Sequence, residues 1–125
     1  MKIKEVMNRA VAVDHDISVK EAARIMSDKN IGSVVALKKG KIMGIVTEKD
    51  IIRNVENINK KISSIMSRNV VTIEQDEDLD EAAILMKKNC IKRLPVTKDG
   101  ELVGIITSTD MIANSDELNE EFLFD

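Results

Sequence analysis

The sequence predicts an α+β fold in which two pseudo-twofold-related β-α-β-β-α repeats pack through their sheets. The first observation is an internal repeat, since residues 10–55 return as residues 70–115 without a gap. The second is that strand-like and helix-like patterns follow one another in the same order in both copies. The third is size: a unit of about 60 residues is marginal alone, so two copies in one chain should share a core.

Each repeat begins with a short apolar strand and a capped helix. We predict the strands at residues 11–13 and 70–73. Ser18 with Glu21, and Asp78 with Glu81, then have the spacing of a helix N-cap and a carboxylate three residues later. Apolar residues that follow at helical spacing predict a helix whose buried face belongs to the core.

A hairpin and a second helix complete each repeat. The predicted strands are residues 33–37 with 42–46, and 93–96 with 102–106. The second turn contains Asp-Gly between two apolar runs, which is a strong hairpin signal. The second helices are predicted at residues 49–55 and 109–113.

These elements divide the chain into a first repeat (1–58), a second repeat (59–114) and an acidic tail (115–125). A polar linker, residues 56–61, joins the repeats. The tail is either a frayed end or a short amphipathic segment that docks on a partner subunit.

Composition limits the classes of function. The chain is 43% hydrophobic and 33% charged, and its net charge of −3 gives no basic field for nucleic acid. No apolar run approaches the roughly 20 residues of a membrane span, and nothing resembles a signal peptide. Cys90 is the only cysteine, which excludes an internal disulfide and fits a reducing compartment. We therefore expect a cytoplasmic protein that binds neither membrane nor nucleic acid.

Aromatic residues are almost absent, which constrains any ligand site. The chain has no Trp or Tyr, and its only aromatic residues are Phe122 and Phe124. The core must therefore be aliphatic, and a bound base would lie between aliphatic side chains rather than on a ring.

The sharpest local pattern stands where the last strand of each repeat meets the second helix. It reads Gly-Ile-Val-Thr-Glu-Lys-Asp at residues 44–50 and Gly-Ile-Ile-Thr-Ser-Thr-Asp at residues 104–110. Glycine admits the close approach of a ligand or a second backbone. A helix start suits phosphate, and a carboxylate can accept two hydrogen bonds from a ribose diol.

The same pattern is also capping geometry, with Thr as N-cap and an acidic residue in the first turn. Two details favour a ligand. The first helices use Glu to reach back to the N-cap amide, whereas these helices use the shorter Asp. The Gly, Thr and Asp also persist in both copies, although most surface residues differ between the copies.

With these residues in place, the chain resembles a pair of CBS domains, also called a Bateman module. The family pattern is a strand–helix–strand–strand–helix repeat of about 60 residues that ends in Gly-h-h-[Thr/Ser]-x-x-Asp, where h is apolar. Both repeats match it in register. Residues 91–96, Ile-Lys-Arg-Leu-Pro-Val, also resemble the family's second-strand signature, and the starts of both repeats resemble its first segment.

The resemblance implies two clefts between the repeats for an adenosine-containing ligand, with AMP, ADP or ATP preferred and S-adenosylmethionine possible. The Asp would hold the ribose, the first strand would contact the base, and basic residues of the other repeat would hold phosphate. The first implied cleft contains Ala12, Val13, Thr47, Asp50, Lys92 and Arg93. The second contains Gly32, Ser33, Val71, Thr72, Thr107 and Asp110.

These implied clefts are unequal, because only the first has the family's basic pair. The second would have a phosphate cation only if Lys49, Arg53 or a neighbouring subunit supplied one. We therefore expect the Asp50 cleft to be the better nucleotide site, and the other to be empty or to prefer a less charged ligand.

No pattern assigns a catalytic residue or a metal site. Asp14-His15-Asp16 contains the only histidine, but it sits at a predicted turn with no third type of ligand nearby. The histidine has no plausible nucleophile partner either. We expect no enzyme activity and no required cofactor.

Two functions remain open. One is a stand-alone regulatory module that binds an adenosine ligand and signals its occupancy to an unidentified effector protein. The alternative is a dimerisation or interaction module whose clefts are vestigial. The resemblance also implies a homodimer, for which we expect the second helices, around residues 51–52 and 111–112, to pair. Otherwise these apolar residues simply cover the internal sheet.

Overall fold

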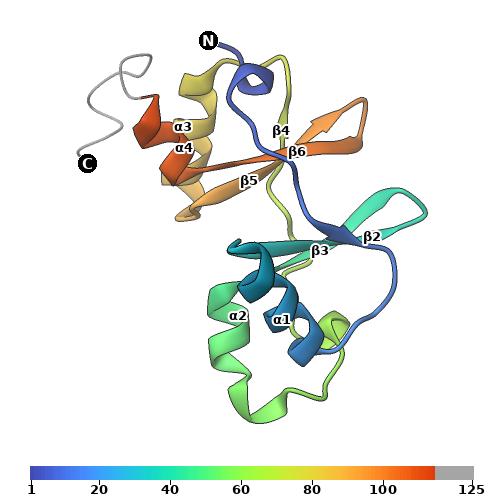
Figure 1. Cartoon of the computed structure of the whole chain (residues 1–125). Coiled ribbons are helices and arrows are strands. Elements are labelled where there is room, and N and C mark those ends of the chain that lie inside the picture. The colour runs from blue at the N-terminus through green and yellow to red at the C-terminus, as the bar shows by residue number, and fades with distance from the viewer. Residues whose placement is uncertain (115–125) are drawn as a thin grey trace. The chain divides into compact units, whose positions relative to one another are not determined.

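The computed structural model describes residues 1–114, which form two compact units (Figure 1). One unit is Val11–Val70, and the other combines Met1–Ala10 with residues 71–114. Each unit contains a three-stranded sheet and two α-helices. The predicted acidic tail lies outside the described residues. None of the helices in residues 1–114 has the length and apolar character that a membrane crossing requires.

The Val11–Val70 unit has the predicted order of elements. These are β1 (Ala12–Val13), α1 (Val19–Lys29), β2 (Ser33–Lys38), β3 (Lys41–Thr47), α2 (Glu48–Arg53) and two short 3-10 helices, η2 (Val55–Asn57) and η3 (Ile62–Ser64). The sheet order is β1-β2-β3, in which β1 runs parallel to β2 and β3 runs antiparallel to it.

The other unit repeats this arrangement. Its elements are η1 (Ile3–Glu5), β4 (Ile73–Glu74), α3 (Leu79–Asn89), β5 (Arg93–Lys98), β6 (Glu101–Thr107) and α4 (Ser108–Ala113). The sheet order is β4-β5-β6, with the same parallel and antiparallel pairings. The predicted mixed α+β composition, with a strand, helix, hairpin and helix in each copy, is therefore confirmed.

The boundaries differ from the prediction mainly at the first strands. The strand predicted at residues 70–73 begins only at Ile73, because only Ile73 and Glu74 have partners on β5. Both hairpins turn through two residues with positive φ, Lys39-Gly40 (52° and 79°) and Asp99-Gly100 (51° and 82°). This geometry matches the right-handed twist of the strands. The predicted Asp-Gly turn is confirmed.

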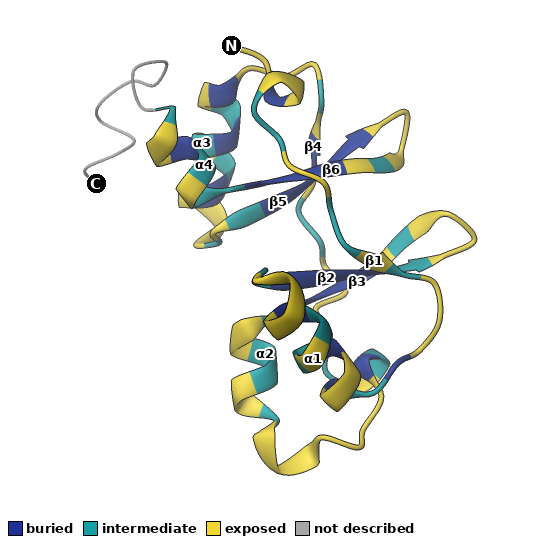
Figure 2. Ribbon diagram, in the orientation of Figure 1, coloured by how far each residue is buried: buried dark blue, intermediate teal, exposed yellow. Residues whose placement is uncertain are grey.

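Each unit buries its own aliphatic core between the sheet and the helices (Figure 2). The core of the Val11–Val70 unit contains Ile17, Ala22, Met26, Val34, Ala36, Val46 and Ile62. The core of the other unit contains Ile3, Ile73, Leu79, Ala82, Met86, Leu94, Val96, Ile106 and Met111. Most of these residues recur sixty positions apart, so both copies of the sequence build the same core.

The opening segments of the two repeats (residues 1–10 and 61–70) each pack in the unit of the other repeat. Ile3 is fully buried in the core formed by residues 73–111, and Ile62 is 1% exposed in the core formed by residues 17–46. The compact units therefore differ at their first residues from the predicted repeats, 1–58 and 59–114. The repeats are defined by similarity between two segments of the sequence, whereas the units are defined by which side chains share a core.

The linker predicted at residues 56–61 also has a structural role. The carbonyl of Ile58 accepts the N–H of Lys20 at 2.9 Å, and the carbonyl of Lys60 accepts the N–H of Val19 at 2.8 Å. These two amides belong to the first turn of α1 and have no partner within the helix. Residues 58–60 therefore satisfy the start of α1.

Candidate functional site

The two Thr-x-x-Asp turns have the same geometry in both units. Thr47 ends β3 and is the N-cap of α2, and Asp50 lies in the first turn of that helix. One carboxylate oxygen of Asp50, Oδ2, accepts the N–H of Thr47 at 2.8 Å and its hydroxyl at 3.2 Å. In the other unit, Oδ2 of Asp110 accepts the same two groups of Thr107, at 2.8 Å and 2.9 Å.

These bonds establish the capping interpretation in both copies. The sequence argument that aspartate is too short to reach the N-cap amide is wrong. The reason is local: Thr47 and Thr107 have extended backbones (φ −114° and −121°), which bring the amide over the first turn. Capping occupies only one carboxylate oxygen, so it does not decide between a structural role and a ligand role.

The two turns differ in the hydrogen bonding of the second carboxylate oxygen, Oδ1, of Asp50 and Asp110. Oδ1 of Asp110 accepts a hydrogen bond from the side-chain amide of Asn8 at 2.7 Å. Within residues 1–114, Oδ1 of Asp50 accepts no hydrogen bond. Both aspartates are half-buried, so the unpartnered oxygen of Asp50 remains reachable by a ligand.

The glycines that open the two motifs are explained by a second backbone. A Cβ atom on Gly44 would lie 2.6 Å from Sδ of Met66 and 2.9 Å from the carbonyl oxygen of Ser67. A Cβ atom on Gly104 would lie 2.7 Å from Sδ of Met7 and 2.8 Å from the carbonyl oxygen of Asn8. Of the two alternatives that the sequence left open, close approach of a backbone is the one that the structure contains.

The start of the middle strand lies beside the Thr-x-x-Asp turn of its own unit. Ser33 pairs with Thr47, and the N–H of Glu48 binds the carbonyl of Gly32 at 3.1 Å. In the other unit, Arg93 pairs with Thr107.

There the N–H of Ser108 binds the carbonyl of Lys92 at 2.8 Å. The structure thus brings the basic pair next to the Asp110 turn and Gly32-Ser33 next to the Asp50 turn. The implied assignment of Lys92 and Arg93 to the Asp50 cleft stays a prediction.

The residues predicted to face the base lie on, or just before, the first strand of each sheet. Ala12 is exposed and Val13 is half-buried on β1, with β2 between them and β3. Val71 and Thr72 precede β4 rather than forming part of it. Val71 packs against the core, and Thr72 is exposed. The structure carries no ligand, so the contact of these residues with a base stays a prediction.

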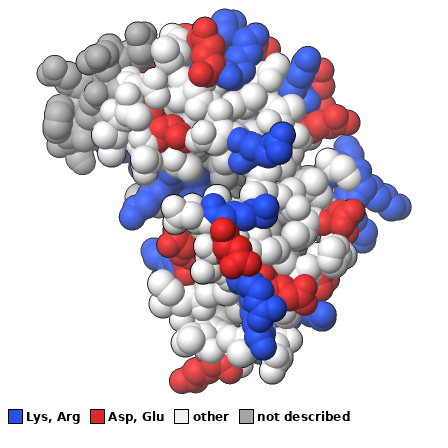
Figure 3. Space-filling view, viewed as in Figure 1, with Lys and Arg blue, Asp and Glu red and all other residues white. Residues whose placement is uncertain are grey.

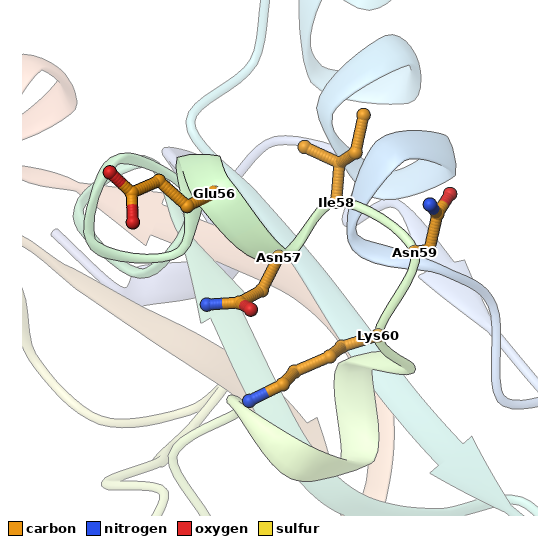
Figure 4. Close-up of a pocket in the computed structure, with 5 residues that line it drawn as sticks. All are labelled: Glu56, Asn57, Ile58, Asn59 and Lys60. Atoms are coloured by element: carbon orange, nitrogen blue, oxygen red, sulfur yellow. The ribbon is translucent and has the colours of Figure 1, made fainter.

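A shallow pocket of about 380 Å³ lies elsewhere, on the linker of the Val11–Val70 unit. It is lined by five consecutive residues, 56–60 (Figure 4). None of them is a predicted site residue. The pocket is formed by one turn of exposed chain and gathers no convergent polar groups from other elements, so it does not have the character of a binding site.

The remaining candidates are surface features. His15 lies 3.0 Å from Asp14, and both side chains are largely exposed. Asp16 instead accepts a hydrogen bond from the N–H of Ser63 at 3.0 Å. Within residues 1–114, no group of three or more His, Cys, Asp or Glu side chains could hold a metal ion. On the face drawn in Figure 3, acidic and basic side chains are interspersed.

Comparisons with known proteins give one consistent family. The CBS domain model matches residues 3–57 and 62–117. A crystal structure of a CBS domain pair in complex with 5′-methylthioadenosine and S-adenosyl-L-methionine is 34% identical, with a TM-score of 0.86. That match covers 93% of this chain and 96% of the other.

Two relatives are enzymes of much greater length. L-aspartate semialdehyde sulfurtransferase of Methanocaldococcus jannaschii is 38% identical over 112 residues, which are 87% of this chain and 22% of the relative. Homoserine O-acetyltransferase of Methanohalophilus mahii is 39% identical over 116 residues, which are 90% of this chain and 24% of the relative. This chain therefore spans about a quarter or less of these two enzymes.

Proposed function

This chain belongs to the CBS-domain family, and from that membership we propose that it is a regulatory module that binds an adenosine-containing ligand. Binding of this ligand would then alter the activity of a partner protein. A ligand can do this only if it binds one conformation of the module more tightly than another. We also propose that the chain itself carries out no catalysis.

One observation carries this proposal: Asp50 is held by its capping bonds while its Oδ1 accepts no hydrogen bond in the described residues. A carboxylate that is already oriented loses little freedom when it accepts a ribose hydroxyl. The hydrogen bond would also be charge-assisted, which makes it shorter and stronger than a neutral one. We propose that Thr47 and Asp50 hold the ribose, with Ala12 and Val13 near the base.

Two classes of adenosine ligand fit this proposal. The predicted class is the adenine nucleotides AMP, ADP and ATP, whose phosphate would need Lys92 or Arg93. The CBS domain pair that is 34% identical binds 5′-methylthioadenosine and S-adenosyl-L-methionine, neither of which carries a phosphate. That likeness supports the adenosine moiety as the recognised part and S-adenosyl compounds as the second class.

The test is isothermal titration calorimetry with AMP, ADP, ATP, S-adenosylmethionine and 5′-methylthioadenosine. We expect saturable binding to the wild-type chain and a loss of roughly tenfold or more in Asp50→Ala. A hydrogen bond to a charged group is worth roughly 1.5–3 kcal/mol, which sets that factor. Lys92→Ala with Arg93→Ala should weaken only the phosphate-bearing ligands.

Glu48→Gln is the matched control, because it removes an acidic group from the same first turn of α2, where the side chain is exposed. It should bind like the wild-type chain. Thermal melting of each variant identifies loss of binding that follows from unfolding. The absence of heat with every ligand, in a folded protein, would contradict this proposal.

An interaction module is the second candidate, and exposed apolar residues on the second helices support it. Ile52 on α2 is 72% exposed and Ile112 on α4 is 68% exposed, whereas Ile51 and Met111 pack into the cores. In each predicted pair, one residue therefore packs against the core of its own unit and the other is exposed. We propose that Ile52 and Ile112 belong to a homodimer interface.

A further inference from the structure

We propose that Asn8 is a specificity-determining residue that makes the Asp110 turn the weaker of the two ribose acceptors. The proposal rests on the proposed function, because it concerns the same Thr-x-x-Asp turns. It adds a reason, inside the described structure, why two copies of one motif should bind adenosine unequally.

The inequality lies in a single atom of each carboxylate. Oδ2 of Asp110 is committed to Thr107, and Oδ1 accepts the amide of Asn8 at 2.7 Å, so both oxygens have partners. Oδ2 of Asp50 is committed to Thr47 in the same way. Of the four carboxylate oxygens of Asp50 and Asp110, Oδ1 of Asp50 is the one with no hydrogen bond from residues 1–114.

Ser67 occupies the place in the Val11–Val70 unit that Asn8 occupies in the other. Asn8 exchanges two backbone hydrogen bonds with Ile105, at 2.8 Å and 2.9 Å. Ser67 exchanges the same two bonds with Ile45, both at 3.0 Å. The backbones therefore correspond, and the difference is the side chain. A serine side chain is one bond shorter than that of asparagine, and Ser67 forms no hydrogen bond with Asp50.

This difference changes what a ribose must displace. At Asp50, a ribose hydroxyl meets an oriented oxygen that protein groups leave unoccupied. At Asp110, the hydroxyl must displace the Asn8 amide or share the oxygen with it, and the amide bond is charge-assisted. Asn8 is exposed, so water compensates the displaced amide and the penalty stays moderate. We expect a difference of about tenfold in Kd, which corresponds to about 1.4 kcal/mol.

The test exchanges the two side chains in backgrounds that leave one turn intact. Asp50→Asn reports on the Asp110 turn, and Asp110→Asn reports on the Asp50 turn. The probe is 5′-methylthioadenosine, because a ligand without phosphate removes any effect of Lys92 and Arg93. In calorimetry, Asn8→Ser in the first background should tighten binding about fivefold to tenfold. Ser67→Asn in the second background should weaken binding by a similar factor.

Asn8→Ala provides a second variant, which removes the amide without introducing a hydroxyl, and it should tighten binding as Asn8→Ser does. Thermal melting verifies that each variant is folded at the titration temperature. Unchanged or weaker binding in both Asn8 variants would overturn the inference. Equal Kd values in the Asp50→Asn and Asp110→Asn backgrounds, with Asn8 and Ser67 unchanged, would also overturn it. Those results leave the proposed function standing. Absence of binding of every adenosine ligand to the wild-type chain would overturn both.

Discussion

Gly44 and Gly104 are present because a second stretch of backbone crosses them. The carbonyl oxygens of Ser67 and Asn8 would lie 2.9 Å and 2.8 Å from a Cβ atom at these positions. A backbone atom cannot move aside as a flexible side chain can, so any larger residue must displace the crossing segment.

Gly44→Ala should therefore lower the free energy of unfolding by about 1–3 kcal/mol, the usual effect of overpacking. Urea unfolding followed by circular dichroism measures this change. Met43→Ala, at a 36% exposed position of the same strand, is the control and should change stability by less than about 1 kcal/mol. A Gly44→Ala variant as stable as that control would show that the crossing segment yields easily.

Cys90 ends α3 in a left-handed conformation that cysteine does not favour. Its φ is 53°, and the corresponding residue after α1 is Asn30, with φ 52°. Asparagine tolerates this region because its short polar side chain bonds locally, and glycine has no Cβ to clash.

Cys90→Gly should raise the free energy of unfolding by about 1 kcal/mol, because the left-handed conformation costs an L-residue about that much. Asn30→Gly is the matched control, and its effect should be smaller. Thermal melting under reducing conditions compares both with the wild-type chain. A destabilised Cys90→Gly variant would contradict the prediction.

At the scale of elements, matching links tie each opening segment to the turn before the first helix of its unit. Asp16 accepts hydrogen bonds from the hydroxyl and the N–H of Ser63, and these bonds lower its pKa. Asp76 lies 2.9 Å from the ammonium of Lys4, whose hydrogen bond and charge lower the pKa of Asp76. Both carboxyls titrate below their ordinary range in the folded chain.

The sign of the resulting pH dependence follows from these lowered pKa values. The unfolded chain takes up protons near pH 3.9, above the folded pKa of Asp16 and of Asp76. Stability from both links is thus present above that pH and is lost as the pH falls through the folded values. Both links are largely exposed, so solvent screening keeps their contribution small.

We expect the wild-type melting temperature to fall more between pH 5 and pH 3 than that of a variant with Asp16→Asn and Asp76→Asn. Asp28→Asn is the control, because Asp28 is exposed on α1 and its side chain forms no hydrogen bond or ion pair within residues 1–114. Its acid profile should match the wild-type profile. Identical profiles for all three proteins would refute a role of the links in acid stability.

The elements that the sequence predicted are those whose signals are local. The signal for a hairpin turn, an N-cap or an apolar helix face is contained in a few neighbouring residues, and each signal occurs in both repeats. The bond between Asn8 and Asp110 joins residues 102 positions apart, and nothing local indicates it. One extra residue near Asn69 also aligns Met7 with Met66, but that correspondence does not indicate which residues they contact.

At the scale of the whole molecule, exposed apolar side chains on α2, η2 and α4 offer apolar surface to a partner subunit. Ile52, Val55 and Ile112 are each about two-thirds exposed or more. Single exposed residues are ordinary, but the family resemblance implies that these helices pair in a dimer. The homodimer stays a proposal until its mass is measured.

Ile52→Lys combined with Ile112→Lys should convert a dimer to a monomer, because a lysine ammonium at an apolar interface loses its hydration without gaining a partner. Size-exclusion chromatography with light scattering measures the mass. Ile84→Lys, at a 39% exposed position on α3, is the control and should keep the wild-type mass. A wild-type chain that is monomeric would remove the basis of this prediction.

Because each opening segment packs in the unit of the other repeat, the two units are completed at different times during protein synthesis. Residues 1–10 are synthesised before the residues with which Ile3 shares a core, which run from Ile73 to Met111. At 5–20 residues per second, the remaining hundred or so residues take about 5–20 s to synthesise. The Val11–Val70 unit has all its residues well before then. Ile3 and its neighbours therefore spend those seconds without a core, in reach of chaperones or of a neighbouring nascent chain.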